Sequence, residues 1–356
     1  MKSIPMAKSP LTPYQRFMAS VGAFIVIALT VLLLKVAAGI LIPIAIALVI
    51  WYVLITLMNI YQRLHIGERH LPENAALLLA VLTVGLAFYL VVVIMNNNYQ
   101  SLVDQLPTYQ EKIEDRLDSI EAYFDIEGLS LSAFVDDIEV GDVFKRAASE
   151  IGNTARLSIA VLVYVIFLLI EYRKFGKKLS YVFTNRQQLR NVEKILMRIN
   201  TDIQTYIGLQ SLASLLTASA VYLVLKVFGV PFAEFWGLLT FILNFIPVIG
   251  SIIATIFPLL SAIVQFDSLV PVLVLAAIIG SIQFTIGNLF LPRFVGNSLN
   301  LSPLTILISL AVWGQIWGVA GMFLSVPIMV IINIILARFE ATRWVAILLS
   351  GNGKVR

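Results

Sequence analysis

The stretch Phe235–Gln265, FWGLLTFILNFIPVIGSIIATIFPLLSAIVQ, decides the fold class of this chain. It carries no Asp, Glu, Lys or Arg, and an uncharged apolar run of about 20 residues is typical of a membrane-spanning helix. Asn244, Pro247 and Gly250 divide the run into two pieces, each of which is short for a crossing. Backbone groups freed by such a break need protein or a wet cavity around them. The stretch therefore predicts a broken or hairpinned helix inside a membrane protein.

The composition of the whole chain points to the same class. Of its 356 residues, 59% are hydrophobic and 13% are charged, and the mean hydropathy is +0.92. Soluble domains average about 25% charged residues, so this chain has too little polar surface to cover a soluble fold. Cysteine is absent, which excludes a disulfide framework and a cysteine metal site. We therefore expect an all-α polytopic integral membrane protein rather than a soluble enzyme, a disordered chain or a secreted scaffold.

The other apolar runs are intact in the first half of the chain and interrupted in the second. The run 17–57 is long enough for two crossings, and three consecutive asparagines at 96–98 are expected to end the next span. Further spans are expected at 157–170, 207–227 and 269–291, followed by an interrupted segment at 303–337. Short or interrupted segments are the best sequence pointer to a transport site. In the last segment the interruptions are Gly314, Gly318, Gly321 and Pro327.

These runs divide the chain into five parts. The predicted parts are 1–96 with about three N-terminal spans, 97–154 as an acidic extracytoplasmic helical segment, 155–204 as a fourth span and a basic amphipathic cytoplasmic helix, 205–337 as a transport core with broken or re-entrant hairpins, and 338–356 as a cytoplasmic tail that is flexible at 351–354.

The charges are sorted by sign along the chain. Residues 97–154 hold 13 of the 21 acidic residues and four of the 25 basic ones, which gives this segment a net charge of −9 and the rest +13. Loops rich in Lys and Arg stay on the cytoplasmic side. We therefore expect both termini inside and 97–154 outside. Within this segment, apolar residues at heptad-like spacing form a stripe from Leu106 to Phe124. This apolar stripe is compatible with packing inside the segment or with a subunit contact.

A second stripe lies between the expected fourth and fifth spans. It places basic residues four apart on one helix face, with apolar residues on another. Such a helix either lies in the headgroup layer of an anionic lipid bilayer or presents a solvated face. Nucleic acid is not an expected partner, because stacking aromatics are absent. The stripe consists of Arg186, Arg190, Lys194 and Arg198.

Three motifs in the C-terminal part resemble those of a known family. They are Phe235–Leu239 with Leu243–Ser251, Gly287–Gly296 with Leu299–Pro303, and Trp313–Gly314 with Gly318–Pro327. Their order and spacing over 205–337 are similar to the autoinducer-2 exporter family, the PerM-like permeases. The resemblance implies a multi-pass permease of the bacterial inner membrane that exports autoinducer-2, a small polar signalling molecule, and assembles as a homo-oligomer, with a pentamer favoured.

The same resemblance leaves the energy source open. Some members of the family are linked to sodium–proton exchange, and relatives often have a carboxylate where this chain has Leu291. A sodium (or lithium)/proton antiporter is therefore the alternative function, and the missing carboxylate counts against it. A membrane scaffold that binds a partner through 97–154 is a further alternative.

The candidate site residues are mostly neutral. Gln210, Ser214 and Thr217 share a helix face at i, i+4 and i+7. Such groups either hydrogen-bond neighbouring helices or line a path for a hydroxylated solute. Neutral amides and hydroxyls carry protons poorly, so we expect movement of a small polar solute. Besides these three, the candidates are Asn244, Pro247, Gly250, Gln283, Asn288, Pro292, Arg293 and Gln315.

Catalysis finds no support in the sequence. His65 and His70 are five residues apart, which is not the i, i+4 spacing of a helical zinc site. The Gly-x-x-x-x-Gly-Lys-Ser/Thr loop of nucleotide hydrolases is also missing. We therefore expect no enzyme activity, no cofactor and no metal.

Overall fold

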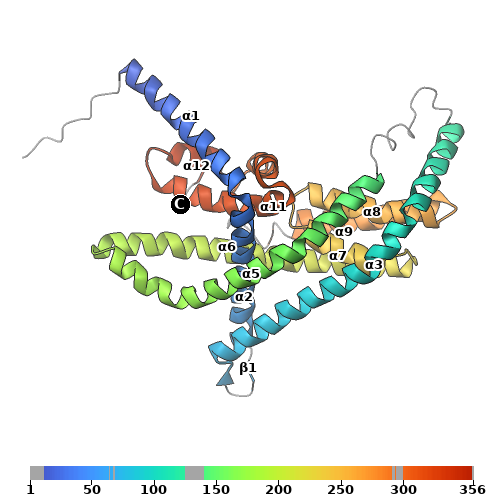
Figure 1. Cartoon of the computed structure of the whole chain (residues 1–356), viewed down its shortest axis with the longest axis horizontal. Coiled ribbons are helices and arrows are strands. Elements are labelled where there is room, and N and C mark those ends of the chain that lie inside the picture. The colour runs from blue at the N-terminus through green and yellow to red at the C-terminus, as the bar shows by residue number, and fades with distance from the viewer. Residues whose placement is uncertain are drawn as a thin grey trace, which may run out of the picture.

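The computed structural model describes residues 12–63, 65–66, 69–124, 140–290, 293 and 300–354. In this part of the chain nearly every residue is helical, apart from a small antiparallel hairpin of β1 (His65–Ile66) and β2 (Arg69–His70) (Figure 1). The helices are α1 (Pro13–Val36), α2 (Ala38–Gln62), α3 (Glu73–Phe124), α5 (Val140–Val182), α6 (Arg186–Val227), α7 (Ala233–Leu243), α8 (Ile249–Gln265), α9 (Leu269–Phe284), the π-helix η1 (Thr285–Phe290), α11 (Pro303–Arg338) and α12 (Arg343–Leu349).

The expected all-α membrane architecture is confirmed. Five of the described helices are long and apolar enough to cross a membrane: α2, the first half of α3, α6, α9 with η1, and α11. Large apolar side chains such as Phe24 of α1, Leu86 of α3 and Phe167 of α5 are more than half exposed. Exposed apolar surface on this scale would be unfavourable in water, and a hydrocarbon surrounding matches it.

The first apolar run forms α1 and α2, which are separated by Ala37 alone. The chain bends at this residue (Figure 1), and α1 stays largely free of the other helices. A hydrogen bond joins the C-terminal end of α1 to α11, because the Trp317 indole N–H donates to the carbonyl of Leu34 at 3.0 Å.

Several helices run past the ends expected from the sequence. Asn96, Asn97 and Asn98 do not end α3, which continues to Phe124. The physical reason is packing, because Ile94 and Met95, just before the asparagines, lie against the apolar cluster of α6, α7, α8 and α9. The Asn98 side-chain amide finds a partner without ending the helix, since it donates to the carbonyl of Ile94 at 2.8 Å. The expected fourth span is likewise only the middle of α5, which continues through Glu171. That carboxylate pairs with Lys178 two turns later.

The basic stripe and the expected fifth span are also one continuous helix, α6, rather than two. Asn185 caps its start by accepting from the N–H of Gln187 at 2.8 Å. No proline interrupts it, and the i, i+4 pair of Arg198 and Asp202, with 3.6 Å between nitrogen and oxygen, bridges the two halves. At 1.5 Å per residue, α6 is about 63 Å long, so the stripe extends away from the apolar half.

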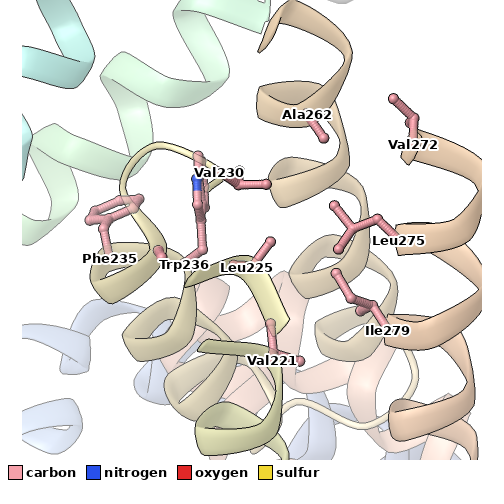
Figure 2. Packing of buried hydrophobic residues seen from close by; sticks show 10 residues of the cluster. Val221, Leu225, Val230, Phe235, Trp236, Ala262, Val272, Leu275 and Ile279 are labelled. Atoms are coloured by element: carbon pink, nitrogen blue, oxygen red, sulfur yellow. The ribbon is translucent and has the colours of Figure 1, made fainter. Parts of the chain in front are cut away.

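Helix α6 is the centre of the packing, since it contacts α2, α7, α9, η1 and α11. One apolar cluster joins α6 to α7, α8 and α9, and Figure 2 shows its side chains converging from these helices. Trp236 of α7 is 1% exposed there and stacks on Phe257 of α8. A second cluster joins Ile203 and Ile207 of α6 to α2, to Leu301 and to the second half of α11. A third packs α2 against α3 and α5.

Candidate functional site

The first broken helix lies where the sequence predicts it. Helix α7 ends at Leu243, α8 begins at Ile249, and the five residues between them form a tight turn. The N–H of Ile249 donates to the carbonyl of Pro247 at 2.7 Å, and Val248 between them has φ 63° and ψ −62°. This is a γ-turn with positive φ, a rare and strained conformation that is least favourable for a β-branched residue. The break is therefore a strained connection rather than a frayed helix end.

Close contact across this break depends on a glycine. A Cβ at Gly250 would lie 1.8 Å from the carbonyl oxygen of Leu243, far inside van der Waals contact. Only glycine lets the first turn of α8 pack directly on the last turn of α7. The two helices are thereby held as a closely packed pair.

The second broken helix is built in the same way. Helix α11 consists of two helical pieces that meet at Gly318, whose φ of 61° and ψ of −141° are not helical. A Cβ at Gly321 would lie 1.9 Å from the carbonyl oxygen of Trp313. The Ser309 hydroxyl donates to the carbonyl of Ser325 at 3.1 Å, which ties the two pieces together. The predicted interruption is therefore confirmed at Gly318, whereas Pro327 remains inside the second helical piece.

The polar face of α6 meets the first break. The Gln210 side-chain amide donates to the carbonyl of Asn244 at 2.7 Å. Gln210 is 8% exposed, and Ser214 and Thr217, on the same face, are essentially buried. The Thr217 hydroxyl donates to the carbonyl of Ala213 at 2.9 Å, whereas the buried Ser214 hydroxyl has no partner among the described residues. The structure thus brings together four of the predicted residues where α6 meets the first break. They are Gln210, Ser214, Thr217 and Asn244.

The other candidates are more dispersed. Pro247 is half-buried in the γ-turn, and Gln283 is half-buried near the end of α9. The side-chain nitrogen of Gln283 is buried and has no partner among the described residues. Asn288 lies in η1, which packs against α6, but its own side chain is exposed. Gln315 and Arg293 are exposed as well, and Pro292 lies outside the described residues.

The basic stripe presents a mostly exposed surface. Arg186, Arg190 and Lys194 are exposed, whereas Arg198 is half-buried beside Asp202. The stripe therefore lies away from the Gln210–Asn244 contact. The side chains of the apolar stripe from Leu106 to Phe124 lie outside the described residues, whereas Lys112, next to the stripe, is described and exposed.

One irregular element of the structure was not foreseen. Residues 285–290 form a π-helix, in which hydrogen bonds span five residues instead of four. Single π-helical turns inside apolar helices are frequent at functional sites. This one contains Gly287 and Asn288 of the second motif. Their low helix propensity signals a weak point in the span but does not specify π geometry.

The buried polar groups of the described residues share one property, since all of them are neutral. No Asp, Glu, Lys or Arg belongs to this buried set, and no cluster of potential metal ligands occurs among the described residues. The ion pair between Lys226 of α6 and Glu234 of α7, 2.8 Å apart, is exposed. Along the polar face of α6 at the first break, the arrangement can therefore offer amides, hydroxyls and backbone carbonyls to a solute. The neutral buried set comprises Gln210, Ser214, Thr217, Thr240, Ser261, Thr305, Ser309, Ser325, Asn333 and Ser350.

Comparison with known proteins gives a consistent result. The sequence profile of the AI-2E family transporter matches residues 23–341. A putative transport protein of Borreliella burgdorferi is 30% identical over 256 residues, which cover 70% of this chain and 69% of that protein. The AI-2 transport protein TqsA of Escherichia coli K12 is 28% identical over 328 residues, covering 90% and 92%. A putative transport protein of Haemophilus influenzae is 27% identical over 343 residues, covering 94% and 96%.

The matched region contains both broken helices and the polar face of α6. Together with the five apolar helices, this match places the protein among multi-pass membrane transporters. The chain belongs to the AI-2E transporter family.

Proposed function

We propose that the protein moves a small, polar, uncharged solute across the membrane along the buried face of α6 and the adjacent break between α7 and α8. The observation that carries this proposal is the 2.7 Å hydrogen bond from Gln210 to the carbonyl of Asn244. It joins a buried amide of a continuous helix to a backbone carbonyl that the break has freed from helical pairing. A hydroxylated solute can exchange hydrogen bonds with both kinds of group.

The neutrality of this site favours a solute over a proton as the transported species. Proton relays in membranes use chains of Asp, Glu or His, and the buried polar side chains of the described residues are all amides and hydroxyls. The family resemblance implies a carboxylate at the position that Leu291 occupies in this chain. We therefore favour solute transport over sodium/proton antiport.

The substrate that we propose is autoinducer-2 or a similar small polar signal, and the direction is export from the cytoplasm. Support comes from family membership and from a relative that is itself named an AI-2 transport protein. We place the protein in the bacterial inner membrane as a homo-pentamer, which native mass spectrometry of detergent particles can test. A mass corresponding to one chain only would contradict the oligomer.

The test of solute transport is a flux assay with purified protein in vesicles. We expect Gln210→Leu to lower the flux of the transported solute several-fold, because the break loses its partner on α6. Ser214→Ala should also lower it, since a buried hydroxyl with no other partner is removed. The matched controls are the exposed residues Gln188 and Ser219 of α6. Gln188→Leu and Ser219→Ala should transport at the parent's rate.

The assay also separates the alternatives. Unchanged flux in Gln210→Leu and Ser214→Ala, with normal assembly, would contradict the proposed path. Collapse of an imposed pH gradient on addition of sodium would favour the antiporter instead. If the protein moves no solute from a broad panel but binds a partner through 97–154, the scaffold is the better explanation.

A further inference from the structure

The segment after α12 is bound to the segment that precedes α11. The backbone N–H of Ser302 donates to the carbonyl of Leu349 at 3.0 Å, and the N–H of Gly351 donates to the carbonyl of Asn300 at 3.1 Å. These two bonds flank Leu301 and Ser350, which pair as an antiparallel β-bridge. Residues 351–354, expected from the sequence to be flexible, are therefore part of an ordered contact.

Side chains strengthen this contact from both sides. The Thr305 hydroxyl donates to the carbonyl of Leu349 at 3.0 Å, and the Asn300 side-chain amide donates to the carbonyl of Lys354 at 2.7 Å. Leu301, Thr305 and Ser350 are each less than 10% exposed. We call residues 300–305 together with 349–354 the clasp.

The clasp joins two helix ends of opposite polarity. Ser302 is the N-cap of α11, and its hydroxyl accepts from the N–H of Thr305 at 3.1 Å. Leu349 is the last residue of α12, so its carbonyl has no partner within that helix. The positive N-terminal end of α11 therefore meets the negative C-terminal end of α12, which is a favourable arrangement.

The position of the clasp gives it a mechanical consequence. The two pieces of α11 are closely packed at Gly321 and Trp313, near the break. At the ends of α11 far from the break, α12 follows the second piece in the chain. The clasp bonds the end of α12 to the first turn of the first piece. Leu301 of the clasp also packs in the cluster that contains Ile203 and Ile207 of α6. The broken helix is thus fastened at both ends and docked on α6 just before Gln210.

We propose that the clasp is a positioning element of the transport core, which keeps the two pieces of α11 together as one unit against α6 throughout the transport cycle. This inference rests on the proposed function, because the motion that the clasp restrains matters only if the chain transports a solute. The residues that carry it are Leu301, Thr305 and Ser350, none of which lies on the proposed path.

A disulfide provides the direct test, since the chain has no cysteine of its own. The hydrogen bonds flank the Leu301–Ser350 pair instead of joining it, so it is a non-hydrogen-bonded pair with Cα atoms about 4.5 Å apart, within disulfide range. We expect Leu301→Cys/Ser350→Cys to cross-link on mild oxidation of membranes and to transport at the parent's rate when cross-linked. Failure to cross-link, or loss of flux that a reductant restores, would overturn the proposal.

Weakening the clasp is the complementary test. Thr305→Val keeps the shape of the side chain and removes its hydroxyl, so we expect several-fold slower flux. The cross-link, added to Thr305→Val, should restore the parent's rate, and a reductant should remove the rescue. The matched control is Thr201→Val, because Thr201 is exposed on α6. A second variant lacks residues 350–356 and should also transport more slowly. If both this variant and Thr305→Val transport at the parent's rate, the proposal is overturned.

A thiol-labelling measurement separates this inference from the proposed function. The Ser350→Cys thiol should react slowly in the otherwise unchanged chain, because Ser350 is 7% exposed. It should react several-fold faster in the Thr305→Val background. If no solute is transported, the proposed function fails while slow labelling and efficient cross-linking still support the clasp. Rapid labelling in the otherwise unchanged chain would contradict the clasp itself.

Discussion

The side-chain amide of Gln210 donates to the backbone carbonyl of Asn244 at 2.7 Å. The two residues are 34 positions apart in the sequence, and each belongs to a different structural context. Gln210 lies inside an unbroken helix, whereas Asn244 begins the connection between two short helices. The bond satisfies a carbonyl that a continuous helix would have paired with a later N–H group. It is the contact on which the proposed path depends.

Removing this bond should destabilise the protein. Gln210→Met keeps the length of the side chain and leaves the carbonyl of the half-buried Asn244 without its donor, which costs about 0.5–1.5 kcal/mol. We expect a lower midpoint in thermal unfolding of the detergent-solubilised protein. Asn244→Leu should have a smaller effect, because the bond uses only the backbone of Asn244. Equal midpoints for the parent and Gln210→Met would contradict the role of the bond.

Relief of the strained γ-turn should stabilise the resting structure. Positive φ at a residue such as Val248 costs about 1–3 kcal/mol, whereas glycine adopts it readily at a cost of about 0.5–1 kcal/mol in chain entropy. We therefore expect Val248→Gly to raise the unfolding free energy by about 1 kcal/mol. If the cycle uses that strain, flux should fall at the same time. The control is Ile249→Gly in the first turn of α8, which should lower the unfolding free energy. A lower unfolding free energy in Val248→Gly would argue against strain at this turn.

The two closely packed glycines should tolerate no side chain. A Cβ at Gly250 or Gly321 would lie within 2 Å of a backbone carbonyl oxygen, so Gly250→Ala and Gly321→Ala must separate the packed helices. We expect each to cost about 3 kcal/mol, the upper end of ordinary overpacking. Gly280→Ala is the control, because a Cβ there meets nothing within 4 Å. Size-exclusion profiles and thermal unfolding would reveal the difference, and normal behaviour of both variants would refute the close packing.

The orientation in the membrane can be read from thiol accessibility. Lys112, in the acidic segment 97–154, and Arg190, in the basic stripe, are both exposed. Since basic loops remain cytoplasmic, Lys112→Cys should react with an impermeant maleimide added to spheroplasts. Arg190→Cys should react only after the membrane is opened. The reverse pattern would invert the proposed topology.

The sequence alone predicted much of the architecture for local reasons. Apolar composition fixes the membrane class, because the bilayer needs long uncharged helices. Residues 244–248 and Gly318 break helices through proline and glycine, whose effects act within a few positions of the chain. The shared face of Gln210, Ser214 and Thr217 follows from helical spacing alone, and all three are buried as a set.

Other features were decided only by tertiary structure. Asn96–Asn98 look like a helix end, yet α3 continues, because without proline a helix end depends on what the helix packs against. The tail at 351–354 looks flexible until the bonds that join Gly351 and Lys354 to Asn300 are seen. The pairing of Gln210 with Asn244 is likewise set by how α6 packs on α7. Helix spacing and breaks are local properties of the chain, whereas the partners of buried polar groups are chosen when distant helices come together.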